Sequence, residues 1–176
     1  MRKLFFLFLL PLSYVACNNN NATPPATVSA DTAAAVTMPY TASYSSNFTA
    51  GKQSDVLTVL NSYKAWETGD MAGLKGTISD SILYIFPNGH TFNNTRDSFI
   101  VMASKFRDSL SKVQIDMVAW TSNHSVDKNE DWVNVWYKET DTYKSGKVDS
   151  LNFEDANQLK NGKVVFVTSY QQKLKP

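Results

Sequence analysis

The chain has 176 residues, of which 43% are hydrophobic and 12% aromatic, and its 17 basic residues nearly balance 16 acidic ones. This length fits one domain with a single buried core, and the balanced charge gives no indication of nucleic-acid binding. A single cysteine excludes an internal disulfide and a set of thiolate metal ligands.

The N-terminus has the three-part layout of a secretory signal. Arg2 and Lys3 precede an apolar run over 4–12, which is shorter than the roughly 20 residues of a membrane-spanning helix. Cys17, directly after Ala16, resembles the acylated cysteine of the bacterial lipobox, although Tyr14 replaces the usual aliphatic residue. The alternative is ordinary cleavage after a small-x-small triplet, for which Tyr14 is also too bulky.

The expected organisation is therefore a signal peptide over 1–16, a lipid-anchored tether over 17–50 and one domain over 51–176. The tether is rich in Asn, Ala, Thr, Ser and Pro, and this composition predicts a flexible segment. Its aromatic end, up to Phe48, favours contact with the domain. The lipobox resemblance implies a membrane-anchored lipoprotein in the periplasm or at the outer membrane, with the lipid bilayer as a partner of Cys17.

Apolar residues at helical spacing predict two helices at the start of the domain. Ser54 or Asp55 is positioned to cap the first helix, and Gly69 is positioned to end it. Asp70 then caps a shorter helix whose apolar stripe reaches Ile78.

A strand over 81–86 and a Pro-Asn-Gly turn over 87–89 predict a hairpin before a third helix. That helix is expected to begin at Asn94, with Asp97 completing the cap, and its apolar stripe reaches Leu110. Alternating apolar residues and Asn-, Gly- or Asp-containing breaks then predict four long strands. Their expected ranges are 112–123, 131–143, 147–160 and 163–173.

This order of elements resembles the nuclear-transport-factor-2-like fold. The segments 63–70 and 161–165 are similar to the end of that family's first helix and to its final hairpin, and the chain most resembles SnoaL-like lipoproteins of Bacteroidetes-type bacteria. The resemblance implies a cystatin-like α+β cone, with three helices packed on a curved, mostly antiparallel sheet in the order α-α-β-β-α-β-β-β-β.

A cone of this type implies a pocket on the concave face of the sheet. Its abundant aromatic residues favour an apolar or ring-bearing ligand, or else form ordinary core. The candidate walls are Tyr63, Trp66, Tyr84, Phe86, Trp120, Trp136 and Tyr170.

Asp155 is the first candidate for acid–base chemistry, because it shares a strand phase with apolar residues. The resemblance to ketosteroid isomerases implies that Asp155 helps to stabilise an enolate and that Tyr63 corresponds to the oxyanion tyrosine. The same alignment places Ile85 where the proton-abstracting carboxylate belongs, which disfavours isomerase activity. The alternative to a catalytic Asp155 is a carboxylate that faces water. Asp116 is a second candidate, for which a solvated strand charge is the alternative.

The two histidines, His90 and His124, lie in separate loops without a matching acidic cluster, so neither a metal site nor a cofactor is expected. The leading hypothesis is an exported, non-catalytic protein that binds a small hydrophobic molecule. One alternative is a SnoaL-like isomerase, cyclase or hydrolase that uses Asp155. Another is an interaction module that forms a homodimer through its sheet face.

Overall fold

The computed structural model describes residues 37–173, and from Tyr40 onward these form one compact unit. Cys17 and the expected signal peptide lie outside the described residues. The described part forms three helices and seven strands, and none of these helices is long and apolar enough to cross a membrane. The elements are β1 Phe48–Ala50, α1 Gln53–Thr68, α2 Met71–Thr77, β2 Ile78–Ile85, β3 Thr91–Thr95, α3 Arg96–Arg107, β4 Leu110–Ser125, β5 Glu130–Tyr143, β6 Val148–Lys160 and β7 Lys163–Lys173.

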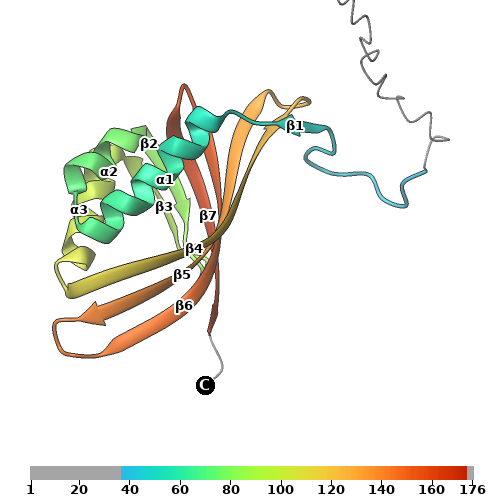
Figure 1. Ribbon diagram of the computed structural model, residues 1–176. Coiled ribbons are helices and arrows are strands. Elements are labelled where there is room, and N and C mark those ends of the chain that lie inside the picture. The colour runs from blue at the N-terminus through green and yellow to red at the C-terminus, as the bar shows by residue number, and fades with distance from the viewer. Residues whose placement is uncertain (1–36, 174–176) are drawn as a thin grey trace, which may run out of the picture. The chain divides into compact units, whose positions relative to one another are not determined.

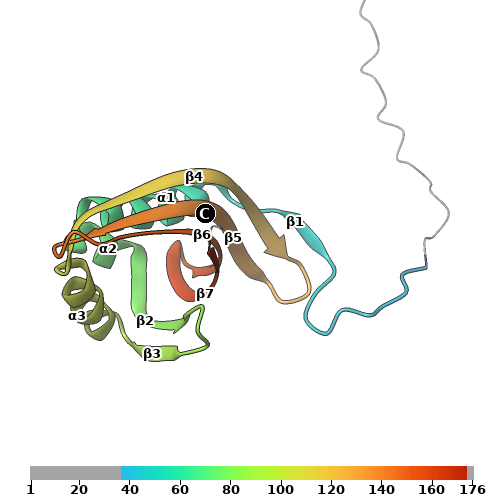
Figure 2. The same ribbon diagram turned by 90° about the horizontal axis from the view of Figure 1, so that it is seen from below.

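All seven strands belong to one mixed, open sheet in the order β1-β4-β5-β6-β7-β2-β3. Only the pairing of β2 with β7 is parallel among the described strands. The sheet curves strongly, so that β2 and β3 lie across from the long strands, and the three helices cover its concave side (Figures 1 and 2). This arrangement confirms the expected α+β cone.

The core lies between α1 and the concave face of the sheet. Val59 of α1 and Val133 and Val135 of β5 have no solvent exposure. These β-branched side chains suit both the pleated strand surface and the close helix–sheet contact. The alternation that predicted β5 from sequence is thus the pattern that buries its inner face.

Two local signals of the first helices are confirmed. Gly69 adopts the left-handed conformation, with a φ of 76°, and its N–H bonds to the carbonyls of the last turn of α1. Asp70 caps α2 by accepting a 2.8 Å hydrogen bond from the Gly73 N–H. Ile78, expected in the apolar stripe of the second helix, instead opens β2.

The predicted caps of α1 and α3 were wrong. Lys52 occupies the N-cap of α1 without a side-chain bond, while Asp55 lies buried inside the first turn. At α3, Thr95 is the cap and accepts a 3.3 Å bond from the Ser98 N–H. Asn94 belongs to β3, because the hairpin pairing with β2 extends through Thr95.

Two further boundaries differ from the sequence expectation. Leu110, expected on the third helix, opens β4 and is buried there. Phe48–Ala50, placed in the tether by composition, forms β1 and pairs with the end of β4. A strand of three exposed residues carries no periodicity of its own, so only its partner strand defines it.

Candidate functional site

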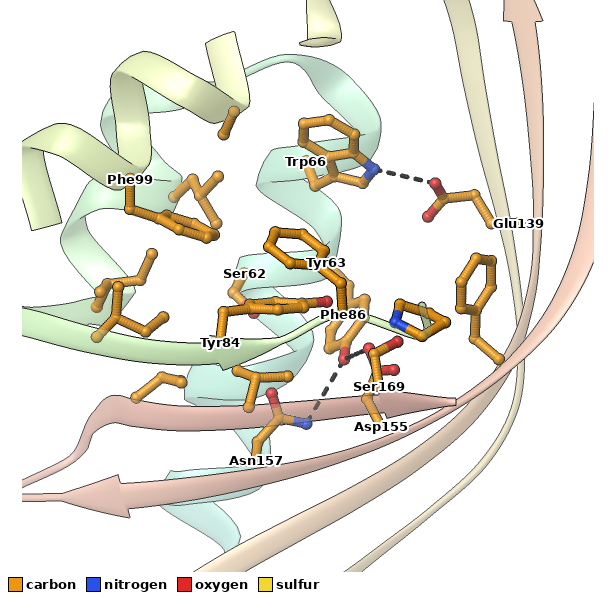
Figure 3. A pocket seen from close by; sticks show the side chains of 18 of the residues that line it. Ser62, Tyr63, Trp66, Tyr84, Phe86, Phe99, Glu139, Asp155, Asn157 and Ser169 are labelled. Carbon is orange, nitrogen blue, oxygen red and sulfur yellow. Dashed lines mark hydrogen bonds between the residues drawn. The ribbon is translucent and has the colours of Figure 1, made fainter. Parts of the chain in front are cut away.

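A cavity of about 500 Å³ lies between the three helices and the concave face of the sheet. Its walls are mainly apolar, and its polar side chains gather around Asp155 and Glu139 (Figure 3). The volume is in the usual range for small-molecule sites. The aromatic residues that line it are Tyr63, Trp66, Tyr84, Phe86, Phe99, Phe106, Tyr137 and Phe153.

Four of the aromatic residues expected as pocket walls line this cavity, namely Tyr63, Trp66, Tyr84 and Phe86. Tyr63 and Trp66 come from α1, whereas Tyr84 lies on β2 and Phe86 directly follows that strand. The first helix and the first strand of the hairpin therefore face each other across the cavity through aromatic side chains.

The other three expected wall residues do not line the cavity. Trp136 alternates along β5 with the inward-facing Tyr137, so its ring lies on the other face of the sheet. Tyr170 alternates in the same way with Ser169 on β7 and is 64% exposed. Trp120 lies half-exposed on β4, which contributes no residue to the cavity.

Asp155 lies at the cavity wall and is only 2% exposed. Its Oδ2 accepts a 2.6 Å hydrogen bond from the Tyr63 hydroxyl and a 3.0 Å bond from the Tyr137 hydroxyl. Asn157 donates to the Tyr63 oxygen over 3.5 Å and to the Val133 carbonyl over 3.2 Å. Helix α1 and strands β5 and β6 therefore converge on one carboxyl group.

The pKa of Asp155 is raised above its ordinary value, because burial disfavours the charged form more than the hydroxyls of Ser169, Tyr63 and Tyr137 favour it. Burial also holds the pKa of the Tyr63 hydroxyl well above its usual range, which keeps this group a hydrogen-bond donor. The second carboxyl oxygen of Asp155, Oδ1, has no hydrogen-bond partner among the described groups. Asp155 thus has one oxygen that is buried at the cavity wall without a close hydrogen bond.

Asp116 lies outside this site. It is exposed on β4, where it accepts a 3.2 Å hydrogen bond from Gln114, and it does not line the cavity. Its position therefore agrees with the alternative, a solvent-exposed charge on a strand.

Glu139 is a pocket residue that the sequence reasoning missed. It lies on the inner face of β5, and the Trp66 indole N–H donates a 3.3 Å hydrogen bond to its Oε1 (Figure 3). Burial, together with the negative charge of the nearby Asp141, raises the pKa of Glu139 to about 8. The signal was present, because the alternation through Val133, Val135 and Tyr137 continues to Glu139.

The β2 edge of the cavity contains no acidic side chain. Tyr84 and Phe86 line it, whereas Ile85, between them, does not. The cavity therefore has its carboxyl groups on β5 and β6. Within residues 37–173, no three His, Cys, Asp or Glu side chains converge as a metal site requires.

No sequence-family model matches the chain, and no curated protein matches it either. Its structure is similar to solved structures of one fold. A protein assigned as a SnoaL-like polyketide cyclase from Jannaschia sp. CCS1 has a TM-score of 0.56 and 14% identity, covering 69% of this chain and 87% of that one.

A nuclear-transport-factor-2-like protein of unknown function from Burkholderia pseudomallei has a TM-score of 0.53 and 17% identity, with coverages of 68% and 91%. An epoxide hydrolase from M. tuberculosis has a TM-score of 0.59 and 7% identity, with coverages of 68% and 84%. These likenesses show that the chain has the nuclear-transport-factor-2-like fold. At such low identities they leave the activity open, because this fold carries different functions.

Proposed function

We propose that the protein binds a small, largely apolar molecule in the cavity, with a polar group directed at Asp155. The observation that carries this proposal is the composition of the cavity: aromatic and aliphatic walls surround a few convergent polar groups. Such walls supply binding free energy by burial of apolar surface, and the polar groups fix the orientation of the ligand.

The surroundings of Asp155 indicate which polar group the ligand carries. The raised pKa of Asp155 favours the form that can donate to a ligand oxygen through Oδ1. The hydroxyls of Tyr63 and Tyr137 hold the carboxyl in place, and Asn157 in turn donates to the Tyr63 oxygen. A hydroxyl or carbonyl on a ring-bearing molecule meets this requirement. A ligand that leaves Oδ1 unpaired would lose about 1–3 kcal/mol relative to one that pairs it.

The test uses the neutral fluorescent probe N-phenyl-1-naphthylamine and the purified full-length protein. We expect fluorescence enhancement on binding, and Ala103→Phe should weaken it about ten-fold or more because Ala103 lines the cavity. Val101→Phe is the matched control, because Val101 lies on the same helix but is 56% exposed. Unchanged binding by a folded Ala103→Phe variant would overturn the proposal.

Acid–base catalysis is a second candidate, favoured by the two pocket carboxyls whose pKa values are raised. On an epoxide, Asp155 would donate a proton to the ring oxygen as its carbon–oxygen bond breaks. Water would form the new carbon–oxygen bond and return a proton to the Asp155 carboxylate. The solved structures of this fold include an enzyme named as an epoxide hydrolase, so styrene oxide is a reasonable first substrate. Diol formation that Asp155→Asn abolishes while probe binding persists would support catalysis, and no diol above the buffer rate would count against it for epoxides.

We also propose that the protein is exported and anchored through an acylated Cys17. The signal-like N-terminus and the position of Cys17 support this. Metabolic labelling with a fatty-acid analogue should mark the wild-type protein and leave Cys17→Ser unlabelled. Equal labelling of both proteins would contradict the proposed anchor.

A further inference from the structure

The described lining of the cavity contains carboxyl groups and no cationic side chain. Glu139 and Asp155 both line it, whereas none of its described lining residues is Lys, Arg or His. Asp141 lies two residues beyond Glu139 on the same face of β5, opposite Asp149 of β6. Burial raises the pKa of Asp141, which lies outside the lining, and Arg107 offsets part of this increase. Glu139 and Asp155 have no cationic partner within the described lining.

Two carboxyl oxygens near this end are buried and unpaired. Oδ1 of Asp155 and Oδ1 of Asp141 make no close hydrogen bond among the described groups. Ser169 lies near enough to Asp155 to offset part of the pKa increase that burial causes, and Glu139 does the same for Asp141. A buried acid without a counter-charge is held in its neutral form, because ionising it there removes a charge from water without giving it an ionic partner. A ligand that carries a positive charge would supply what these groups lack.

Glu139 contacts Trp66, and further aromatic rings line the same cavity. Trp66, which donates to Glu139, stacks on Phe106 with ring centroids 6.0 Å apart and an interplanar angle of 2°. Phe153 stacks on Tyr137 at 5.2 Å and 13°. All four rings line the same cavity, and the faces of such rings attract cations.

We propose that the ligand of this cavity is an organic cation, with an apolar body and an ammonium-type group that pairs with Glu139. This inference rests on the proposed function, because the apolar body occupies the same cavity. An anion is disfavoured because both acids of the lining would have to stay protonated beside it, and a neutral molecule makes no ionic contact with Glu139. The aromatic rings beside Glu139 contact the charged group, and the aliphatic and aromatic walls beyond them contact the rest.

Binding of a cation beside Glu139 should release a proton from the protein. Glu139 is influenced by Asp141 on its own strand, by Asp155 on β6 and by the Trp66 N–H on α1, and its pKa is about 8. It is therefore mostly protonated at pH 7, and a bound cation favours the ionised form. Cation binding at pH 7 should release about one proton per ligand, and the affinity should rise as the pH increases through about 8.

The test compares benzyltrimethylammonium with its neutral carbon isostere, 2,2-dimethylpropylbenzene, by calorimetry on the full-length protein. The quaternary cation has no proton of its own, so any proton released comes from the protein. At pH 8.5 we expect the cation to bind about ten-fold tighter or more. Titrations at pH 7 in two buffers of different ionisation enthalpy should show the proton release.

Glu139→Gln keeps the side-chain shape and removes the charge. It should weaken cation binding about ten-fold, abolish proton release and leave binding of the neutral isostere within about two-fold. Asp116→Asn is the matched control, because it removes an exposed carboxyl outside the cavity. Both variants are checked for a cooperative thermal unfolding transition, which shows that they are folded.

The outcomes separate the two proposals. Equal affinities for the two probes in the wild type would overturn the cation inference and leave the apolar-ligand proposal standing. Binding of neither probe would count against both. If Glu139→Gln fails to fold, proton release by the wild type still decides, because its absence during cation binding would exclude Glu139 as the partner.

Discussion

The Tyr63 hydroxyl donates a 2.6 Å hydrogen bond to Oδ2 of Asp155, joining α1 to a strand 92 residues further along the chain. Tyr137 donates to the same oxygen from β5. This shared acceptor fixes the polar end of the cavity and ties the helix to the two central strands. The bond therefore affects both the stability of the fold and the charge state of the pocket.

Tyr63→Phe should raise the pKa of Asp155 further, because the lost hydrogen bond favours the ionised carboxyl. The free energy of unfolding should fall by about 1–2 kcal/mol. Carboxyl carbon NMR titration and urea unfolding measure the two effects. Tyr170→Phe is the control, since Tyr170 is exposed on the outer face; a lower Asp155 pKa in Tyr63→Phe would contradict this account.

Stability should fall with pH because of Glu139. Its folded pKa of about 8 lies above its ordinary value of 4.5, so the folded state holds the proton more tightly. The contribution to stability is complete below about pH 4.5, falls between 4.5 and 8 and is lost above 8. Glu139→Gln should therefore stabilise the protein by about 1–3 kcal/mol more at pH 9 than at pH 5.

Urea unfolding of the wild type and Glu139→Gln at both pH values measures this difference. Asp116→Asn is the control and should show the pH dependence of the wild type. A Glu139→Gln variant whose stabilisation is the same at pH 5 and pH 9 would exclude a raised Glu139 pKa.

Arg107 should stabilise the junction between α1 and α3. It donates to the carbonyls of Trp66 and Glu67 over 3.2 Å each and to that of Leu110 over 3.4 Å. Arg107→Ala leaves these helix-end carbonyls without their donor, so we expect a loss of about 1–3 kcal/mol in chemical unfolding. Lys105→Ala, an exposed position on the same helix, should stay within about 0.5 kcal/mol, and an equal loss in both variants would argue against this role.

Two glycines should respond oppositely to alanine. Gly69 has a φ of +76°, where a Cβ is strained, so Gly69→Ala should cost about 1 kcal/mol. Gly76 lies in α2, where an added Cβ would meet no other atom within 4 Å, so Gly76→Ala should be neutral or stabilising by up to about 1 kcal/mol. Thermal unfolding of the two variants checks the contrast, and the same sign of change in both would refute it.

Much of the secondary structure was determined by sequence signals that act locally. Gly69 and Asp70 define the junction of α1 and α2, because a left-handed glycine and a capping carboxylate need only their own turn. The four long strands follow from alternation and from turn residues, and Lys163–Lys173 has the predicted bounds. The N-cap of α1 escaped prediction, because the helix begins earlier, at Gln53, so that Asp55 lies inside its first turn and Lys52 at the cap.

The site depended on the tertiary structure. Tyr63, Glu139 and Asp155 belong to three elements, and the sheet register decides which faces of β5 and β6 meet α1. Sequence alternation identified Asp155 as sharing a phase with apolar residues but could not say which side of the sheet that phase faces. That choice is made by helix packing on one side of a curved sheet, which also directs Trp136 and Tyr170 away from the cavity.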